Sequence, residues 1–396
     1  TTKVGILGAG MMGAGIAYAS SIRGIQVVLK DVSVEAAERG KSYSESLLTK
    51  RVSRKQMTEE KKQQVLDAIL TTDNAKDLEG CDLIIEAVFE ESSLKAKVTQ
   101  ESEPRLNEQG IFASNTSTIP ISQLALASAN AEKFIGLHFF SPVDKMPLVE
   151  IIKGNKTSDE TLAKAFDFVM QIKKTPIVVN DSRGFFTSRV FGTFVNEGVA
   201  MLGEGVPAAS IENAAVLAGM PVGPLALCDE VSLSLITHIR DQSKKDDESQ
   251  GKTWHAHPAE SVINTMVSDQ QRAGKAAGKG FYNYPEKGKK SLWEGLGNLF
   301  GNQAAPTQDL QEIKDRMLFI QSIETLRCLE EAVLLSVRDA NIGSIFGIGF
   351  AAWSGGAIQY VNQYGLKAFV ERANYLAGKY GERFTPPKLL LDQAES

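Results

Sequence analysis

The sequence predicts an α/β domain with a doubly wound, mainly parallel sheet, followed by an all-α domain. Short apolar runs alternate with helix-like stretches up to residue 180, which is typical of parallel strands connected by helices. A glycine-rich turn follows the first run directly. After Asp181 the strand-like runs end, and Ala, Leu, Ile, Met and Glu recur at helical spacing. A helical domain therefore follows the sheet.

Seven short apolar runs in the first part have the length of buried β-strands. They are residues 4–7, 27–29, 83–88, 111–114, 134–140, 148–152 and 177–179. Between the second and third runs, residues 36–70 are rich in Lys, Glu, Gln and Leu at helical spacing. These residues predict a long helix or a helical hairpin inserted after the second strand.

The domain boundaries follow from changes in this pattern. We expect a sheet domain over residues 1–183, a first helical module over 184–285, a Gly/Lys-rich linker over 286–310 and a second helical module over 311–396. A weak internal repeat relates residues 196–202 and 219–224 to residues 329–334 and 347–356. This repeat predicts that the helical module is duplicated.

The composition is that of a globular protein, with 43% hydrophobic and 23% charged residues and a formal net charge of -5. A basic surface for nucleic acid is not expected. The three cysteines lie far apart and in no metal-like spacing, so we expect neither disulfides nor a metal site. No run reaches the ~18 apolar residues of a membrane span, and no leader-like segment precedes the first strand. We therefore expect a cytoplasmic protein that does not bind membranes. Because the chain begins with Thr1 and not Met, it is also a candidate part of a longer polypeptide.

A dinucleotide-binding turn is predicted directly after the first apolar run. The residues Gly8, Ala9, Gly10, Met11, Met12 and Gly13 form the pattern G-x-G-x-x-G. Gly8 allows a tight turn, Gly10 allows a pyrophosphate to approach the backbone, and Gly13 allows the helix to pack near the strand. The helix N-terminus then offers free N–H groups to the phosphates. The predicted sheet is therefore of the Rossmann type, and the alternative is a glycine-rich turn that binds no ligand.

Asp31 ends the second apolar run, where a carboxylate can accept hydrogen bonds from the ribose hydroxyls of adenosine. Its charge would repel a 2′-phosphate, and no Arg follows it directly, so NAD is favoured over NADP. The positive charge of Lys30, directly before Asp31, would instead favour a 2′-phosphate and hence NADP. The alternative is that Asp31 only starts the turn after its strand, where Asp is common.

A histidine and a carboxylate occur in two apolar runs in which neither is expected. His138 lies within residues 134–140, and Glu150 lies within residues 148–152. An imidazole in such a run is unfavourable to bury without a partner. Paired, the imidazole would accept the proton of a substrate hydroxyl while a hydride leaves for a nicotinamide, and the carboxylate would orient the ring. The alternatives are a buried structural pair without a catalytic role, and a Glu150 that faces solvent at a strand edge.

Residues 113–118 form a run of small polar groups after another apolar run. Their hydroxyl and amide groups suit contacts to a ribose, a nicotinamide or a substrate oxygen. Ser, Thr and Asn are equally common in helix caps and turns. Both interpretations remain open at this point.

Together these residues resemble the 3-hydroxyacyl-CoA dehydrogenases, and the similarity extends over most of the chain. The segments that carry it are residues 8–15 with Asp31, 86–90, 113–117, 138–142 with 147–152, 175–181, 184–189, 218–224, 280–284 and 327–331. The duplicated helical module further resembles the dehydrogenase half of multifunctional fatty-acid oxidation proteins, whose other half is an enoyl-CoA hydratase. The resemblance implies NAD as the cofactor and an acyl-CoA thioester as the substrate.

The resemblance also implies roles for individual residues. It makes His138 the general base, Glu150 its partner, and Ser117 a hydrogen-bonding group at the substrate hydroxyl. Around NAD it places Gly8, Gly10, Met11, Met12, Gly13, Asp31, Glu90, Lys95, Asn115 and Ser141. In the inserted helical segment, Ser44 and Arg51 fall where the family contacts CoA, and an arginine can pair with a phosphate through two hydrogen bonds.

Two positions depart from the family's pattern. Ser141 stands where the family usually has Asn after the paired Phe residues, and Ser188 stands where it usually has Asn before the Arg of the Gly-Phe-Phe segment. The second position is expected to help hold the substrate carbonyl or the catalytic pair, so Ser188 stays among the candidate catalytic residues. A shorter hydroxyl reaches such partners through water. We expect activity to be retained with an altered rate or substrate range, because His138 and Glu150 remain.

The sequence thus predicts an oxidoreductase that transfers a hydride between the C3 hydroxyl carbon of (3S)-3-hydroxyacyl-CoA and NAD, in fatty-acid β-oxidation or its reverse. The resemblance alone implies the (3S) configuration. An enoyl-CoA hydratase domain or subunit is the implied partner, and a homodimer is an alternative to a duplicated module within one chain. The same residues also allow two different functions, a dehydrogenase of a free hydroxy acid and a catalytically degenerate NAD-binding assembly partner.

Overall fold

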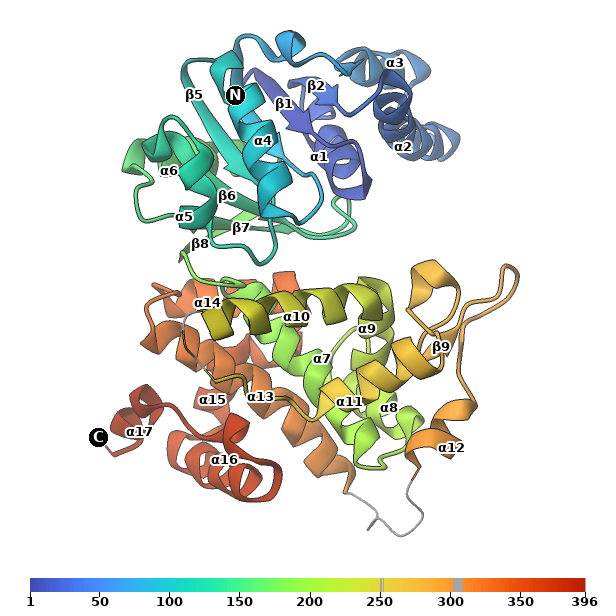
Figure 1. Ribbon diagram of the computed structural model, residues 1–396, viewed down its shortest axis with the longest axis vertical. Helices are drawn as coiled ribbons and strands as arrows, with labels where there is room; N and C mark the ends of the chain where they lie inside the picture. The colour runs from blue at the N-terminus through green and yellow to red at the C-terminus, as the bar shows by residue number, and fades with distance from the viewer. Residues whose placement is uncertain (250, 252, 302–308, 396) are drawn as a thin grey trace. The chain divides into compact units, whose positions relative to one another are not determined.

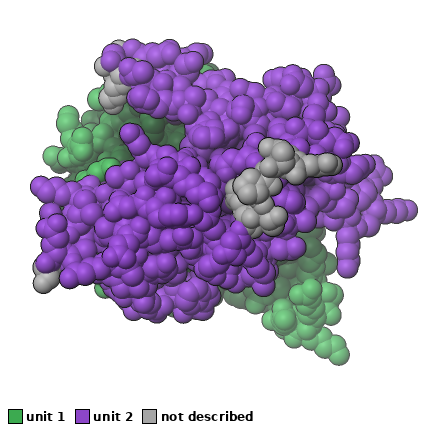
Figure 2. Space-filling view, turned by 90° about the horizontal axis from the view of Figure 1, so that it is seen from below, with its two compact units in different colours: residues 1–188, 331–347 green, residues 189–330, 348–396 purple. Residues whose placement is uncertain are grey.

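The computed structural model describes residues 1–249, 251, 253–301 and 309–395. The chain forms two compact units, which Figure 2 distinguishes by colour. Unit 1 contains residues 1–188 and 331–347, and unit 2 contains residues 189–330 and 348–396. The chain therefore leaves unit 1 after Ser188, returns to it for one short segment, and ends in unit 2.

Unit 1 is built on an eight-stranded sheet with the strand order β3-β2-β1-β4-β5-β6-β7-β8 (Figure 1). The strands are β1 (Lys3–Leu7), β2 (Gln26–Lys30), β3 (Ile69–Thr72), β4 (Cys81–Glu86), β5 (Leu106–Ser114), β6 (Phe134–Phe139), β7 (Leu148–Lys153) and β8 (Thr175–Asn180). All neighbours are parallel except β6 and β7. The order reverses between β1 and β4, and such a switch point is where open α/β sheets bind ligands. The predicted doubly wound, mainly parallel sheet is confirmed.

The seven predicted strands are all present, but β3 was not predicted. Its first two residues, Ile69 and Leu70, lie at the end of the segment that was predicted to be helical. The helices end earlier, with α2 (Val34–Ser53) capped by Ser33 and α3 (Glu59–Asp67) capped by Thr58. Because β3 is a short edge strand with only two buried residues, it lacks the continuous apolar run of the inner strands. The predicted helical hairpin is confirmed as α2 and α3.

Five further helices belong wholly or mainly to unit 1. They are α1 (Met11–Ser21), α4 (Ser92–Ser102), α5 (Ile121–Leu124), α6 (Asp159–Gln171) and α14 (Val337–Ile348). The main core joins apolar residues of α1 and α6, such as Ile16 and Phe168, to the inner strands. Each such side chain contributes about 1.5–3 kcal/mol when it is fully buried. This core fixes the sheet edge on which the candidate site is built.

Unit 2 is mostly helical, as predicted. Its elements are α7 (Thr187–Gly203, starting in unit 1), α8 (Ala208–Ala218), α9 (Pro224–Val231), α10 (Leu233–Ser249), α11 (Ala259–Asn264), α12 (Gly295–Phe300), α13 (Leu310–Glu330), α15 (Ala357–Tyr364), α16 (Leu366–Tyr380), α17 (Lys388–Glu395) and a small sheet of β9 (Tyr282–Asn283) and β10 (Ser291–Leu292). In the ranges described above, no helix is both long enough and apolar enough to span a membrane.

The later part of the chain divides differently from the predicted modules. The linker expected over residues 286–310 contains β10 and α12, while its residues 302–308 lie outside the described residues. Residues 331–347, which the sequence analysis assigns to the second helical module, pack with unit 1. Leu334 forms a β-bridge with Val179 of β8, and Gly343 of α14 faces Ile177 and Phe186.

Two ion pairs join α7 and α13 reciprocally. Arg189 of α7 donates to Glu324 of α13 with nitrogen to oxygen distances of 2.9 and 2.7 Å. Arg316 of α13 donates to Glu197 of α7 at 2.6 Å. The same spacing separates Arg from Glu in both helices, as expected for two copies of one module that contact each other isologously. The duplication of the helical module stays a prediction, and these Arg and Glu positions differ from those of the repeat found in the sequence.

Candidate active site

The predicted site residues gather at one edge of the sheet in unit 1. β1, β4, β5 and β6 are parallel neighbours, so their carboxyl ends meet at this edge. β7 runs in the opposite direction, so its first residues lie at the same edge. The glycine-rich turn, the polar run at residues 113–118 and the candidate pair His138 and Glu150 all lie there. This is the edge at which open α/β sheets bind ligands.

The glycine-rich turn has the backbone that its sequence predicts. Gly8 has a φ of 90°, and a Cβ there would lie 2.7 Å from the carbonyl oxygen of Ala87. A Cβ on Gly13 would lie 1.8 Å from the carbonyl oxygen of Gly8. A Cβ on Gly10, by contrast, would meet nothing within 4 Å. The space beside Gly10 is open at the N-terminus of α1, whose first turn has no acidic residue, and it suits a pyrophosphate.

Asp31 holds the glycine-rich turn at the end of β2. Its Oδ2 accepts a hydrogen bond from the N–H of Ala9 at 2.6 Å, and its Oδ1 accepts one from the N–H of Val32 at 2.7 Å. A carboxylate has about four acceptor sites, so ribose hydroxyls can still bind. Lys30 lies 3.8 Å from Glu101. Asp31 therefore stabilises the turn, as the alternative interpretation predicts, and its remaining acceptor sites can still bind a ribose.

His138 and Glu150 are direct partners across the antiparallel strands β6 and β7. Directly opposed residues of such strands have neighbouring side chains on one face of the sheet. The Nδ1 of His138 lies 2.9 Å from the Oε2 of Glu150, and the two residues are only 7% and 0% exposed. The structure thus brings together the two polar residues found in separate apolar runs.

The other ring nitrogen of His138, Nε2, is not used in the contact with Glu150. The ring packs near Phe140 and Phe185, with centroids 4.5 and 6.1 Å away. Within the part of the chain that the structure describes, Nε2 makes no hydrogen bond. A carboxylate acceptor at Nδ1 keeps the proton on that nitrogen, which leaves a lone pair on Nε2. The pair can therefore accept a proton from a hydroxyl group.

Donors from the turn between β8 and α7 hold the carboxylate of Glu150. Its Oε1 accepts from the backbone N–H groups of Phe186 and Thr187 at 3.0 and 3.1 Å. Its Oε2 accepts from the hydroxyl of Thr187 as well as from His138. The turn contains Gly184 and Phe185 with φ values of 72° and 50°. This left-handed stretch, uncommon for a phenylalanine, reverses the chain and aims the donors at the carboxylate.

Glu90 gathers the polar run at residues 113–118 around one carboxylate oxygen. Its Oε1 accepts from the hydroxyl of Thr116 at 2.6 Å and from the N–H groups of Ser117 and Thr118 at 2.9 and 3.1 Å. The hydroxyl of Ser117 also donates to it, at 3.2 Å. Because a hydroxyl rotates about its C–O bond, Ser117 can donate to a substrate oxygen only after turning away from Glu90.

Lys95 is buried between two carboxylates, with 2% of the residue exposed. Its Nζ lies 3.0 Å from Glu86 and 3.3 Å from Glu90. The hydroxyl of Ser114 also donates to Glu86. Burial raises the pKa of Glu86, although Lys95 and these hydrogen bonds act in the opposite direction. Lys95 therefore orders the carboxylates behind the site, and its contact with NAD stays a prediction.

We expect Glu90→Gln to destabilise the protein at neutral pH and to change its acid sensitivity. Burial acts to raise the pKa of Glu90, but Lys95 and the hydrogen bonds from residues 116–118 lower it below 4.5 overall. The folded state thus favours the charged form, so its stabilisation is complete above that pH and is lost as the pH falls further. The variant should be about 1–3 kcal/mol less stable at pH 7. Thermal unfolding followed by circular dichroism at pH 7 and near pH 3 checks this, and an equal deficit at both values would contradict it.

The remaining predicted NAD contacts lie around the same edge. The Oδ1 of Asn115 accepts from the N–H of Phe139 at 2.9 Å, which ties the end of β5 to the end of β6. Ser141 donates to the sulfur of Met11 at 3.4 Å. Met11 is 67% exposed, whereas Met12 packs against the core. The glycine-rich turn and the segment after β6 therefore meet beside the candidate NAD site.

Three predicted substrate residues make no hydrogen bond to His138 or Glu150 in the described part of the chain. Ser188 follows Thr187 in the first turn of α7, and within the described ranges its hydroxyl makes no hydrogen bond. Ser44 is fully buried in α2, and its hydroxyl has no partner among the residues described. Arg51 lies near the end of the same helix and is partly exposed. Of the two predicted CoA contacts, only Arg51 reaches solvent.

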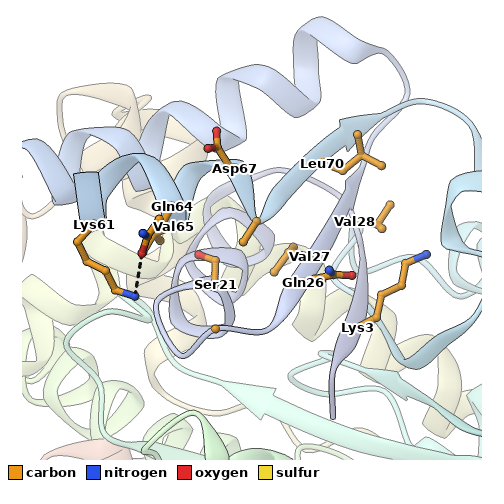
Figure 3. A pocket seen from close by; sticks show the side chains of 12 residues that line it. Lys3, Ser21, Gln26, Val27, Val28, Lys61, Gln64, Val65, Asp67 and Leu70 are labelled. Atoms are coloured by element: carbon orange, nitrogen blue, oxygen red, sulfur yellow. Dashed lines mark hydrogen bonds between the residues drawn. The ribbon is translucent and has the colours of Figure 1, made fainter. Parts of the chain in front are cut away.

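A cavity of about 600 Å³ lies at the other edge of the sheet (Figure 3). It is lined by Lys3 and Gln26 at the starts of β1 and β2, and by Lys61 and Gln64 of α3, which form a hydrogen bond of 3.5 Å. Ligands of open α/β sheets bind at the carboxyl ends of the strands, so this cavity is not the candidate active site. Among the described residues, no cluster suited to a metal ion is found.

Glu86 and Thr187 are two site residues that were not predicted from the sequence. Glu86 is a buried carboxylate at the end of a strand, which is the same anomaly that identified Glu150. Thr187 is a fully buried hydroxyl that follows Phe185 and Phe186. Its signal was weaker, because Ser and Thr are common at the start of a helix for capping alone.

Two domains of one protein family match consecutive parts of the chain. Residues 3–182 match the NAD binding domain of 3-hydroxyacyl-CoA dehydrogenase, and residues 184–284 match its C-terminal domain. The chain belongs to the 3-hydroxyacyl-CoA dehydrogenase family. This is a family of NAD-dependent dehydrogenases, and the first domain is the one that binds NAD. The predicted resemblance and cofactor are confirmed.

Curated relatives in the 3-hydroxyacyl-CoA dehydrogenase family are longer than this chain. The fatty acid oxidation complex subunit alpha of Shewanella amazonensis is 38% identical over 392 residues, which cover 98% of this chain and 54% of that protein. The subunit of the same name from Shewanella loihica is 38% identical over 396 residues, with 100% and 55% covered. The chain thus spans about half the length of the curated relatives it matches.

Solved structures of related dehydrogenases have the same fold. The (S)-3-hydroxybutyryl-CoA dehydrogenase PaaH1 from Ralstonia eutropha is 34% identical, with a TM-score of 0.65, over 72% of this chain and 99% of that one. The 3-hydroxybutyryl-CoA dehydrogenase from Escherichia coli K12 has a TM-score of 0.84 over 100% of this chain and 98% of that one. At 24% identity, the second similarity shows the fold alone.

Proposed function

We propose that this chain interconverts (3S)-3-hydroxyacyl-CoA and 3-ketoacyl-CoA with NAD as the hydride carrier. The observation that carries the proposal is the buried pair of His138 and Glu150 at the carboxyl edge of the sheet, with Nε2 of His138 directed at no protein group. Membership in the family supports the acyl-CoA substrate. The name of the PaaH1 relative supports the (S) isomer.

The sheet edge of unit 1 has groups suited to each part of NAD. The open space beside Gly10 would receive the pyrophosphate at the N-terminus of α1, and the free acceptor sites of Asp31 would receive the adenosine ribose. Asn115 and Ser141 would contact the nicotinamide end, because they lie at the ends of β5 and β6. Bound NAD supplies the hydride acceptor at C4 of the nicotinamide.

His138 would act as the general base of the oxidation and as the general acid of the reverse reaction. Its Nε2 accepts the proton of the C3 hydroxyl while the C3–H bond breaks, and Glu150 stabilises the resulting imidazolium. In the reverse direction the same nitrogen returns the proton to the ketone oxygen. Ser117 would turn its hydroxyl from Glu90 to that oxygen, and Ser188 would reach the thioester side through water. Such proton transfer contributes about 10²–10⁴-fold to the rate.

We also propose that the chain acts beside an enoyl-CoA hydratase domain or subunit in cytoplasmic fatty-acid oxidation. The name of the Shewanella relatives and the half of their length that this chain does not span support this partner. Arg51 would contact the phosphates of CoA, because its side chain is partly exposed. The reciprocal ion pairs of α7 and α13 favour a monomer over a homodimer, and sedimentation velocity distinguishes the two.

Oxidation of NADH, followed by its absorbance, tests the proposal directly. We expect turnover with acetoacetyl-CoA and none with acetoacetate, because the thioester and CoA are part of the recognised substrate. Turnover of the free acid would favour a dehydrogenase of free hydroxy acids. NAD binding without turnover of either acetoacetyl-CoA or a longer ketoacyl-CoA would overturn the proposal and favour a degenerate assembly partner.

A further inference from the structure

We propose that Thr187 is a positioning residue of the active site, which holds the carboxylate of Glu150 in line with the ring of His138. The hydroxyl of Thr187 donates to the Oε2 of Glu150, the same oxygen that lies 2.9 Å from Nδ1 of His138. The hydroxyl itself lies 3.4 Å from that nitrogen. The three groups therefore meet at one point. This inference rests on the proposed function, because it concerns the same pair.

The two oxygens of Glu150 are held by different kinds of donor. The backbone N–H groups of Phe186 and Thr187 hold Oε1, and they remain whatever side chain stands at position 187. Besides the imidazole, only the Thr187 hydroxyl holds Oε2 among the residues described. Without the hydroxyl, the imidazole alone would hold Oε2. The hydroxyl therefore keeps Oε2 opposite Nδ1 independently of the ring.

Thr187 is itself firmly placed and shielded from water. It is 0% exposed, and its Cγ2 methyl faces Gly347, where a Cβ would lie 3.3 Å from it. A β-branched side chain has few rotamers, so the packed methyl directs the hydroxyl towards Glu150. Solvent cannot replace the missing donor in a site without exposed surface. Loss of this hydroxyl should therefore directly affect the position of Glu150 relative to His138.

The test compares three variants in the acetoacetyl-CoA assay. Thr187→Val removes the hydroxyl and keeps the shape, Thr187→Ser keeps the hydroxyl and removes the methyl, and Thr193→Val is the control. The hydroxyl of Thr193 lies in the same helix and donates to the carbonyl of Val190 at 2.7 Å. We expect Thr187→Val to lower kcat about tenfold with unchanged KM for NADH, because a hydrogen bond to a charged group is lost. Thr187→Ser and Thr193→Val should retain most of the wild-type kcat.

Wild-type kcat in Thr187→Val would overturn the inference, and so would an equal loss in Thr187→Ser, which would indicate packing. A second measurement does not need turnover. The low-field proton resonance of Nδ1–H in His138, assigned by its absence in His138→Gln, should move in Thr187→Val and stay in Thr193→Val. If the wild type shows no turnover, the proposed function fails, and the resonance still decides the role of Thr187. An unmoved resonance in Thr187→Val would overturn it.

Discussion

His138→Gln is expected to lower kcat for acetoacetyl-CoA reduction by about 10²–10⁴-fold. A glutamine amide can still donate a hydrogen bond to Glu150, so the buried carboxylate keeps a partner. The amide cannot take up or return a proton, however, and this is the function that the geometry at Nε2 supports. The affinity for NADH should remain close to that of the wild type, because the glycine-rich turn and Asp31 follow other strands, β1 and β2.

Steady-state kinetics and a fluorescence titration of NADH measure the two quantities separately. His255→Gln is the matched control, since this exposed histidine lies in unit 2. A His138→Gln variant that folds, binds NADH and retains more than about a tenth of the wild-type kcat would argue against general base catalysis. It would favour the purely structural pair that the sequence analysis left open.

Gly10→Ala should weaken NAD binding without destabilising the fold. Gly10 has a φ of -67°, which alanine adopts freely, and a Cβ there meets no protein atom within 4 Å. The methyl group would instead occupy the space proposed for the pyrophosphate. Overpacking of this kind costs about 1–3 kcal/mol, which corresponds to a loss of roughly 5- to 150-fold in affinity.

Isothermal titration with NAD and a melting curve test this expectation together. Gly378→Ala is the control, because its added Cβ also meets nothing within 4 Å and it lies in α16 of unit 2. Equal NAD affinity in Gly10→Ala and the wild type would show that no phosphate approaches this turn. Gly13→Ala is unsuitable as a test, since its Cβ would lie 1.8 Å from a backbone oxygen and would disturb the turn itself.

The sequence predicts those parts of the fold in which burial determines the type of residue. The inner strands are buried on both faces, so they read as apolar runs, and a buried His138 or Glu150 stands out against such a run. The pairing of those two residues follows once β6 and β7 are known to be neighbours. The half-exposed strand β3 gives no such signal, because its residues also fit the end of a helix.

Contacts that depend on a tertiary turn or on the register of a repeat were not predictable in the same way. The donors to Glu150 come from a left-handed turn at Gly184 and Phe185, and only glycine hints at such a turn in sequence. The predicted repeat rests on Glu, Leu and Gly positions, whereas the ion pairs between α7 and α13 involve Arg189 and Arg316. The resemblance implies a CoA contact for Ser44, but this residue is buried in α2.

Residues 331–347 complete unit 1, but they are synthesised after much of unit 2. These residues supply α14 and the bridge to Val179 on the edge strand β8, yet the ribosome adds them only after residues 189–330. A nascent chain that stops before residue 331 therefore lacks the bridge to β8 and the helix that packs against Phe186. Open edges and exposed apolar side chains favour aggregation. A fragment ending at residue 284, where the second family match ends, should need a chaperone or another copy of itself to stay in solution.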